Sequence, residues 1–86
     1  MSLLQDEITK HIRKLIKPLK DDELLIPILK KRLTKKEYKL LYMLIEGIDR
    51  SSQMERLNLS LDLLEQLQEK MVKKLNQERL KQELMI

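Results

Sequence analysis

Apolar residues recur at helical spacing along most of this chain of 86 residues. Between residues 3 and 17 they return every three or four positions, which predicts an amphipathic helix that ends before Pro18. The basic positions that would share one stripe of this helix are Lys10, Arg13, Lys14 and Lys17. Such a stripe is either a solvated face or a surface for an anion or a partner.

A second helix is predicted after the acidic residues 21–23, because acidic side chains favour the first turn of a helix. Pro27 lies within the apolar run that follows. The helix either begins at Pro27 and covers residues 27–32, or begins near Asp22 and is kinked at Pro27.

Residues 34–37 fit a capping box, in which Thr34 and Glu37 each accept a hydrogen bond from the backbone amide of the other. The helix that follows would turn its apolar side chains inward, namely Leu40, Leu41, Leu44 and Ile45. Gly47, the chain's one glycine, stands where this helix needs a left-handed residue to stop. Asp49 or Ser52 then caps a short helix over about residues 50–57.

A tight turn is predicted at residues 58–60, with Ser60 as the cap of a longer helix. One face of that helix carries Leu63, Leu64, Leu67, Met71 and Leu75. Asn76 is expected to stop it in the left-handed conformation, and residues 77–85 form a last amphipathic helix with Leu80 and Leu84 on one side. The pattern predicts an all-α fold, a small helical bundle.

Composition supports one small domain, because the chain is too short for two cores and is rich in good helix formers. The absence of cysteine excludes disulfides and thiolate metal sites, and it favours a cytoplasmic location. The beginning of the sequence lacks the pattern of a signal peptide, and the longest apolar run, residues 40–45, is too short to span a membrane. A core of this size gives limited stability, so a homodimer is one candidate state.

The net charge of +4 is unevenly distributed. Residues 1–36 hold ten basic and five acidic side chains, whereas residues 37–86 hold eight basic and nine acidic ones. A polyanion should therefore be attracted to the first part of the chain.

Residues 33–75 resemble the DNA-binding domain of LuxR/GerE-type response regulators. The matching positions are Leu33, Thr34, Glu37, Leu40, Leu41, Met43, Leu44, Glu46, Gly47, Glu55, Arg56, Leu57, Leu59, Ser60, Lys74 and Leu75. Residues 57–75 are also similar to the promoter-reading C-terminal domain of sigma factors. The resemblance implies a four-helix unit with a helix-turn-helix, in which the helix after Ser60 lies in the major groove of DNA and the last helix carries a dimer contact.

Two departures from this family pattern change the functional expectation. Gln53 and Met54 stand where the family has an apolar residue followed by alanine, so a bulkier side chain enters the helix contact. In the predicted recognition helix, acidic and amide side chains share one face, namely Asp62, Glu65, Gln66 and Glu69. Phosphate contacts need Lys or Arg, and acidic side chains are repelled.

Two leading functions remain as hypotheses, beside a third, which is a membrane-surface or RNA-associated role for the basic first helix. In the first, a small helix-turn-helix regulator binds DNA through Lys35, Lys36, Arg50, Ser51, Ser60, Gln66, Lys70 and Lys73. In the second, the acidic, leucine-rich helix binds a transcription component or another regulator through Leu61, Leu63, Glu65, Leu67 and Glu69.

None of these hypotheses involves catalysis. The chain has no glycine-rich phosphate loop and no cysteine nucleophile, and the single His11 has no second histidine to form a metal-binding pair. We therefore expect no catalytic residue, no metal and no cofactor. The expected organisation is an N-terminal helical extension at residues 1–32, a helix-turn-helix domain at 33–76, and a C-terminal helix at 77–86 that is a candidate dimer contact.

Overall fold

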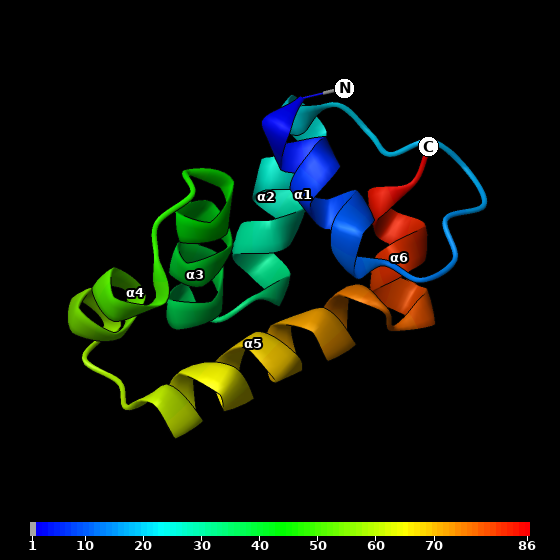
Figure 1. Cartoon of the computed structure of the whole chain (residues 1–86). Coiled ribbons are helices and arrows are strands. Elements are labelled where there is room, and N and C mark those ends of the chain that lie inside the picture. Colours follow the sequence, from blue (N-terminus) through cyan, green and yellow to red (C-terminus); the bar gives the residue numbers. More distant parts are fainter. Residues whose placement is uncertain (1) are drawn as a thin grey trace.

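Residues 2–86, the part of the chain that this computed structural model describes, form six helices joined by loops (Figure 1). The helices are α1 (Leu3–His11), α2 (Asp22–Arg32), α3 (Lys35–Ile45), α4 (Arg50–Leu57), α5 (Leu61–Leu75) and α6 (Glu78–Leu84). The predicted all-α fold is thus confirmed. Of the two alternatives at Pro27, the structure has the longer helix, which begins at Asp22 and continues through Pro27.

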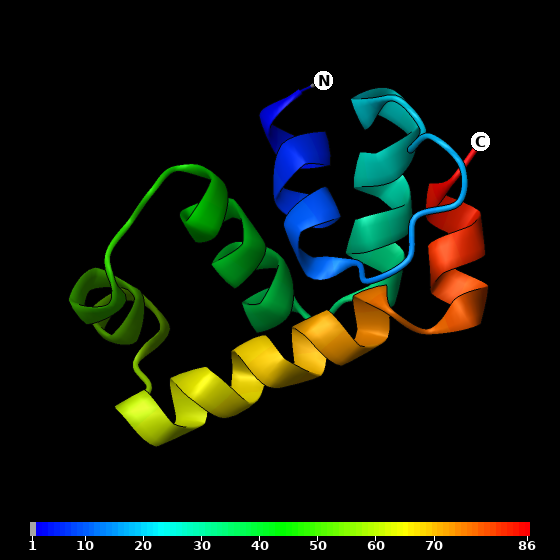
Figure 2. The same cartoon turned by 45° about the vertical axis from the view of Figure 1, so that its right-hand side comes forward.

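The longest helix, α5, runs along one side of the molecule, and the other helices stand against it or beside it (Figures 1 and 2). Both α1 and α3 pack on α5, while α2 packs on α3 and α6. At the beginning of α5, the short helix α4 packs on both α3 and α5. Four helices, α1, α3, α4 and α6, therefore meet on α5.

The buried apolar side chains form two clusters. The larger cluster draws on all helices except α4 and includes Leu4, Ile8, Leu25, Leu29, Leu41, Met71, Leu75, Leu80 and Leu84. The smaller cluster lies under α4 and consists of Leu40, Met43, Leu57 and Leu64. Because residues before 33 and after 76 contribute to the larger cluster, both end segments share one core with the helix-turn-helix segment.

The predicted helix boundaries in the middle of the chain are confirmed. The Thr34 amide donates to Glu37 Oε1 at 2.8 Å, and the Glu37 amide donates to Thr34 Oγ1 at 3.2 Å, which completes the capping box. Gly47 has a φ of 72°, the left-handed value that a non-glycine residue rarely adopts. The side chains of Asp49 and Ser60 accept amide hydrogen bonds at 2.8 and 3.3 Å at the starts of α4 and α5.

The prediction of one helix over residues 3–17 is wrong. The helix α1 ends at His11, and Ile12 is extended, with φ −87° and ψ 126°. Figures 1 and 2 show that α1 and α2 run in the same direction, so the chain between them must travel back along α1. Extended residues cover this distance with about twice the rise of helical ones.

The returning segment is held by the end of the chain. Leu19 and Met85 form an isolated antiparallel bridge, flanked by a hydrogen bond of 2.8 Å from the Lys20 amide to the Leu84 carbonyl. Because residues 12–21 are not helical, the predicted basic stripe does not form, and Arg13, Lys14 and Lys17 lie on the loop.

Asn76 ends α5 as predicted, but not in the left-handed conformation, since its φ is −92°. Its side chain instead joins the ends of two helices. Asn76 Oδ1 accepts from the Arg13 amide at 2.9 Å, and Nδ2 donates to the His11 carbonyl at 2.8 Å. This amide therefore fixes the point at which the chain leaves α1.

Replacement of Asn76 by alanine should lower the free energy of unfolding by about 1–2 kcal/mol, because two backbone groups lose their partner. Urea denaturation measures this change. The matched control is Gln77→Ala at the next, exposed position, whose effect should stay within about 0.5 kcal/mol. Equal effects of the two substitutions would contradict a bracing role for Asn76.

Candidate functional site

In the α3–α4–α5 segment, where the sequence predicts a helix-turn-helix, α3 contacts both α4 and α5, and α4 contacts α5. The turn before α5 passes through Asn58, which is left-handed with φ 54° and ψ 51°. Gln53 stands where the resembled family has an apolar residue. Its side chain is buried and donates to the Ile48 carbonyl at 2.7 Å. Met54 packs, half-buried, against the smaller apolar cluster.

The exposed part of α5 has an acidic side and a basic side. Residues one turn apart lie on the same side of a helix. Glu65 and Glu69 are one turn apart and form the acidic side. Glu65 Oε1 lies 3.5 Å from Arg50 Nη1 of α4. Lys70 and Lys74 are also one turn apart and form the basic side, and Lys74 Nζ lies 2.7 Å from Glu37 Oε1 of α3. The acids face the beginning of α4, and the lysines face the beginning of α3.

On the acidic side, both predicted DNA-contacting cations have a carboxylate as neighbour. Arg50 is paired with Glu65, and Lys73 Nζ lies 3.4 Å from Glu69 Oε1. Both pairs are exposed and contribute little stability. They nevertheless offset the positive charge that Arg50 and Lys73 would offer to a phosphate.

Exposed lysines of α2 and α3 come together at the junction of these two helices. We call Lys30, Lys35 and Lys39 the basic surface. Lys30, Lys35 and Lys39 line one cavity of about 440 Å³, together with Leu33, Thr34 and Tyr38. Lys30 Nζ lies 5.9 Å from the centre of the Tyr38 ring. Burial, together with the neighbouring Tyr42, raises the pKa of Tyr38 to about 12, so the phenol stays neutral beside the lysines.

The structure divides the predicted DNA-binding residues. Lys35 belongs to the basic surface, Lys36 and Lys70 are exposed, and Arg50 and Lys73 pair with acids. The remaining predicted DNA-binding residues, Ser51, Ser60 and Gln66, are exposed. The Ser60 hydroxyl caps α5.

The predicted partner-binding residues are divided as well. Leu61, which is 43% exposed, lies one turn before Glu65 and so accompanies the acids. Leu63 lies two turns before Lys70, on the basic side. The prediction that Leu63 shares one face with Leu64, Met71 and Leu75 is wrong, because those three side chains are buried and that of Leu63 is 50% exposed. Leu67 is half-buried against the smaller cluster.

Sequence reasoning assigned Glu37 only to a helix cap and did not anticipate its contact with Lys74. Glu37 is 1% exposed. Burial alone would raise its pKa, but hydrogen bonds from Lys74 and Thr34, together with the Lys74 charge, outweigh burial and lower the pKa below its ordinary value. The available signal was that Glu37 and Lys74 both belong to the family pattern.

No protein-family model matches this chain, and comparisons with curated proteins and with solved structures give no match. The resemblance to LuxR/GerE-type regulators and sigma factors therefore rests on the residue pattern alone. Within residues 2–86, no helix has the length and apolar character needed to cross a membrane.

Replacement of Glu37 by glutamine should lower the free energy of unfolding at pH 7 by about 2 kcal/mol, because the charge-assisted contact with Lys74 is lost. A carboxylate with a lowered folded pKa stabilises the fold above its unfolded pKa, near 4.5. That contribution disappears as the pH falls through the folded value. Urea denaturation across pH should therefore show a difference that is constant above about pH 6 and shrinks in acid.

Glu55→Gln is the matched control, since Glu55 is exposed on α4. Its effect should remain below about 0.5 kcal/mol at all pH values. A Glu37→Gln difference that does not change with pH would show that the charge of Glu37 has no part in the stability.

Proposed function

We propose that this protein is a small, non-enzymatic DNA-binding protein of the helix-turn-helix type, which holds the DNA backbone through the basic surface. The supporting observation is that Lys30, Lys35 and Lys39 of α2 and α3 line one open cavity, while Lys36 and Lys70 are exposed as well. Two acids that reach this region, Glu37 and Glu83, are already paired with Lys74 and Arg32.

Backbone contacts would dominate the affinity. Each phosphate that a lysine neutralises releases condensed counterions, so binding driven in this way weakens steeply with salt. The first half of α5 would add little base reading, because its exposed acids are repelled by phosphates. Gln66 is the exposed side chain suited to adenine. Transcription regulation in the cytoplasm is the role that this proposal implies.

Homodimerisation through the apolar side of α6 is not part of the proposal. Leu80 and Leu84 are 4% and 0% exposed, because both belong to the larger cluster of the chain itself. A second copy would have to use another surface.

The acidic side of α5 supports a second candidate function, the binding of a basic protein partner such as a transcription component. Leu61 is 43% exposed next to the carboxylates of Glu65 and Glu69. An exposed leucine within an acidic surround suits a partner that offers an apolar pocket with a basic rim.

Replacement of Lys35 and Lys36 by glutamine should weaken the binding of mixed-sequence duplex DNA and make it less salt-dependent. The slope of log affinity against log salt should fall by about 2, since each lost phosphate contact removes about 0.9. Fluorescence anisotropy across salt concentrations measures both quantities. The matched control is Lys14→Gln with Lys17→Gln, which removes the same charge from the loop before α2.

The control pair should keep the wild-type slope and lose little affinity. The proposal is refuted if the wild-type chain binds no duplex DNA at low salt, or if both pairs of substitutions have the same effect.

The second candidate predicts that Leu61→Gln with Glu65→Gln abolishes the stoichiometric capture of a partner from cell extract and leaves DNA affinity unchanged. The matched control is Leu24→Gln, which alters another exposed leucine, 57% exposed, on α2. Quantitative mass spectrometry of the captured proteins measures the loss. Equal recovery of every captured protein with both variants would exclude the acidic side as a partner surface.

A further inference from the structure

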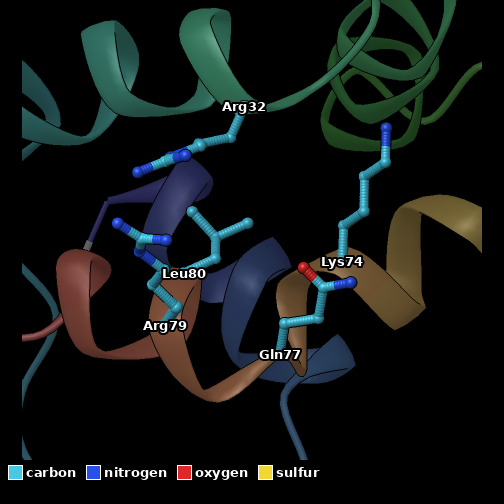
Figure 3. Close-up of a pocket in the computed structure, with 5 residues that line it drawn as sticks. All are labelled: Arg32, Lys74, Gln77, Arg79 and Leu80. Atoms are coloured by element: carbon cyan, nitrogen blue, oxygen red, sulfur yellow. The ribbon is translucent and has the colours of Figure 1, made fainter.

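A separate pocket lies where the end of α2 meets the junction of α5 and α6. It has a volume of about 200 Å³ and is lined by Arg32, Lys74, Gln77, Arg79 and Leu80 (Figure 3). Figure 3 shows the guanidinium groups of Arg32 and Arg79 on the same side of the pocket, with Leu80 beside them. Arginine, lysine and amide side chains thus surround a small space that has an apolar wall.

The charges in this pocket are not balanced. Arg32 donates to both carboxylate oxygens of Glu83, with Nε 3.1 Å from Oε2. Lys74 extends toward Glu37 and gives its charge to that carboxylate. Arg79 makes no ion pair within residues 2–86. Glu83 pairs with Arg32 and lies near Arg79, and three cationic side chains line the pocket, so it keeps an excess of positive charge.

We propose that this pocket binds a phosphate group. Arg79 can donate two hydrogen bonds to the oxygens of a phosphate, a geometry that arginine provides better than lysine, and Arg32 can add one from Nη1, which Glu83 does not contact. The Gln77 amide supplies a further donor at the opposite wall, and Leu80 forms an apolar wall. The phosphate comes either from the DNA backbone or from a free phosphate compound.

Glu83 acts in this site as an internal competitor. Its carboxylate occupies the donors of Arg32 that would otherwise face the phosphate. Removal of that charge should free Arg32 and strengthen phosphate binding, whereas removal of the Arg79 charge should weaken it. A single surface cation would not give these opposite responses.

The test is a titration of the full chain with inorganic phosphate and with pyrophosphate, at constant ionic strength set by chloride and followed by amide chemical shifts. The wild-type chain should show saturable shifts around Arg32 and Gln77. Arg79→Gln should weaken binding at least about fivefold, and Glu83→Gln should strengthen it by a similar factor. The matched control is Arg56→Gln, an exposed position on α4, which should leave the affinity unchanged.

A parallel titration with a short DNA duplex identifies the source of the phosphate. If Arg79→Gln weakens both titrations, the pocket accepts a backbone phosphate; if it weakens only that with inorganic phosphate, the natural ligand is a free phosphate compound. Either result supports the site. The proposal is overturned if Arg79→Gln and Glu83→Gln leave both titrations unchanged. The inorganic titration does not depend on DNA binding, so failure of the proposed function leaves this test valid.

Discussion

The carboxylate of Glu37 is the contact on which the arrangement of α3 and α5 depends. It is 1% exposed, and it accepts hydrogen bonds from the Thr34 amide at 2.8 Å and from Lys74 Nζ at 2.7 Å. A buried carboxylate is unfavourable unless all its partners are present. The same side chain therefore starts α3 and requires the last part of α5 to lie beside that start, so that a local cap becomes a tertiary link.

This link also determines how α5 is rotated. Once Lys74 faces α3, the helical repeat places Lys70 on that side and Glu65 and Glu69 on another. The basic surface lies at the junction of α2 and α3, because the end of α2 leads directly into the capped start of α3. The separation of charge on α5 is thus a consequence of how one buried acid is satisfied.

Local chemistry made much of the fold predictable from the sequence. Thr34, Gly47 and Ser60 mark helix boundaries through their own side chain or backbone, so their neighbours in sequence suffice. The end of α1 was not predictable in this way. Ile12 has a helical pattern around it, but the return of the chain depends on Leu19 meeting Met85, which is remote in sequence.

The candidate surfaces also combine features that neighbouring residues determine with features that depend on residues remote in sequence. Lys35, Lys36 and Lys70 were identified from charge and from the family pattern. Lys73 and Glu69 are one helical turn apart, so their pairing follows from their spacing in the sequence. The pairing of Arg50 with Glu65 requires the α4–α5 turn, and the opposite placement of Leu61 and Leu63 requires the rotation of α5. The pocket at Arg32 and Arg79 joins residues that no local pattern connects.

The width of a helix decides whether the acids of α5 weaken a phosphate contact made elsewhere. An α-helix with its side chains is about 10–12 Å wide, and the Debye length at physiological salt is about 8 Å. Lys35 lies about 200° around α3 from Glu37, which faces α5, so the width of α3 separates Lys35 from the acids of α5. The charges of Glu65 and Glu69 are therefore largely screened from a phosphate held at Lys35, whereas Lys70 directly follows Glu69 and has no such separation. At low salt the screening length exceeds the helix width, and the acids then oppose both contacts. The acidic side of α5 is thus compatible with phosphate binding at the basic surface, and it stays accessible to a protein partner.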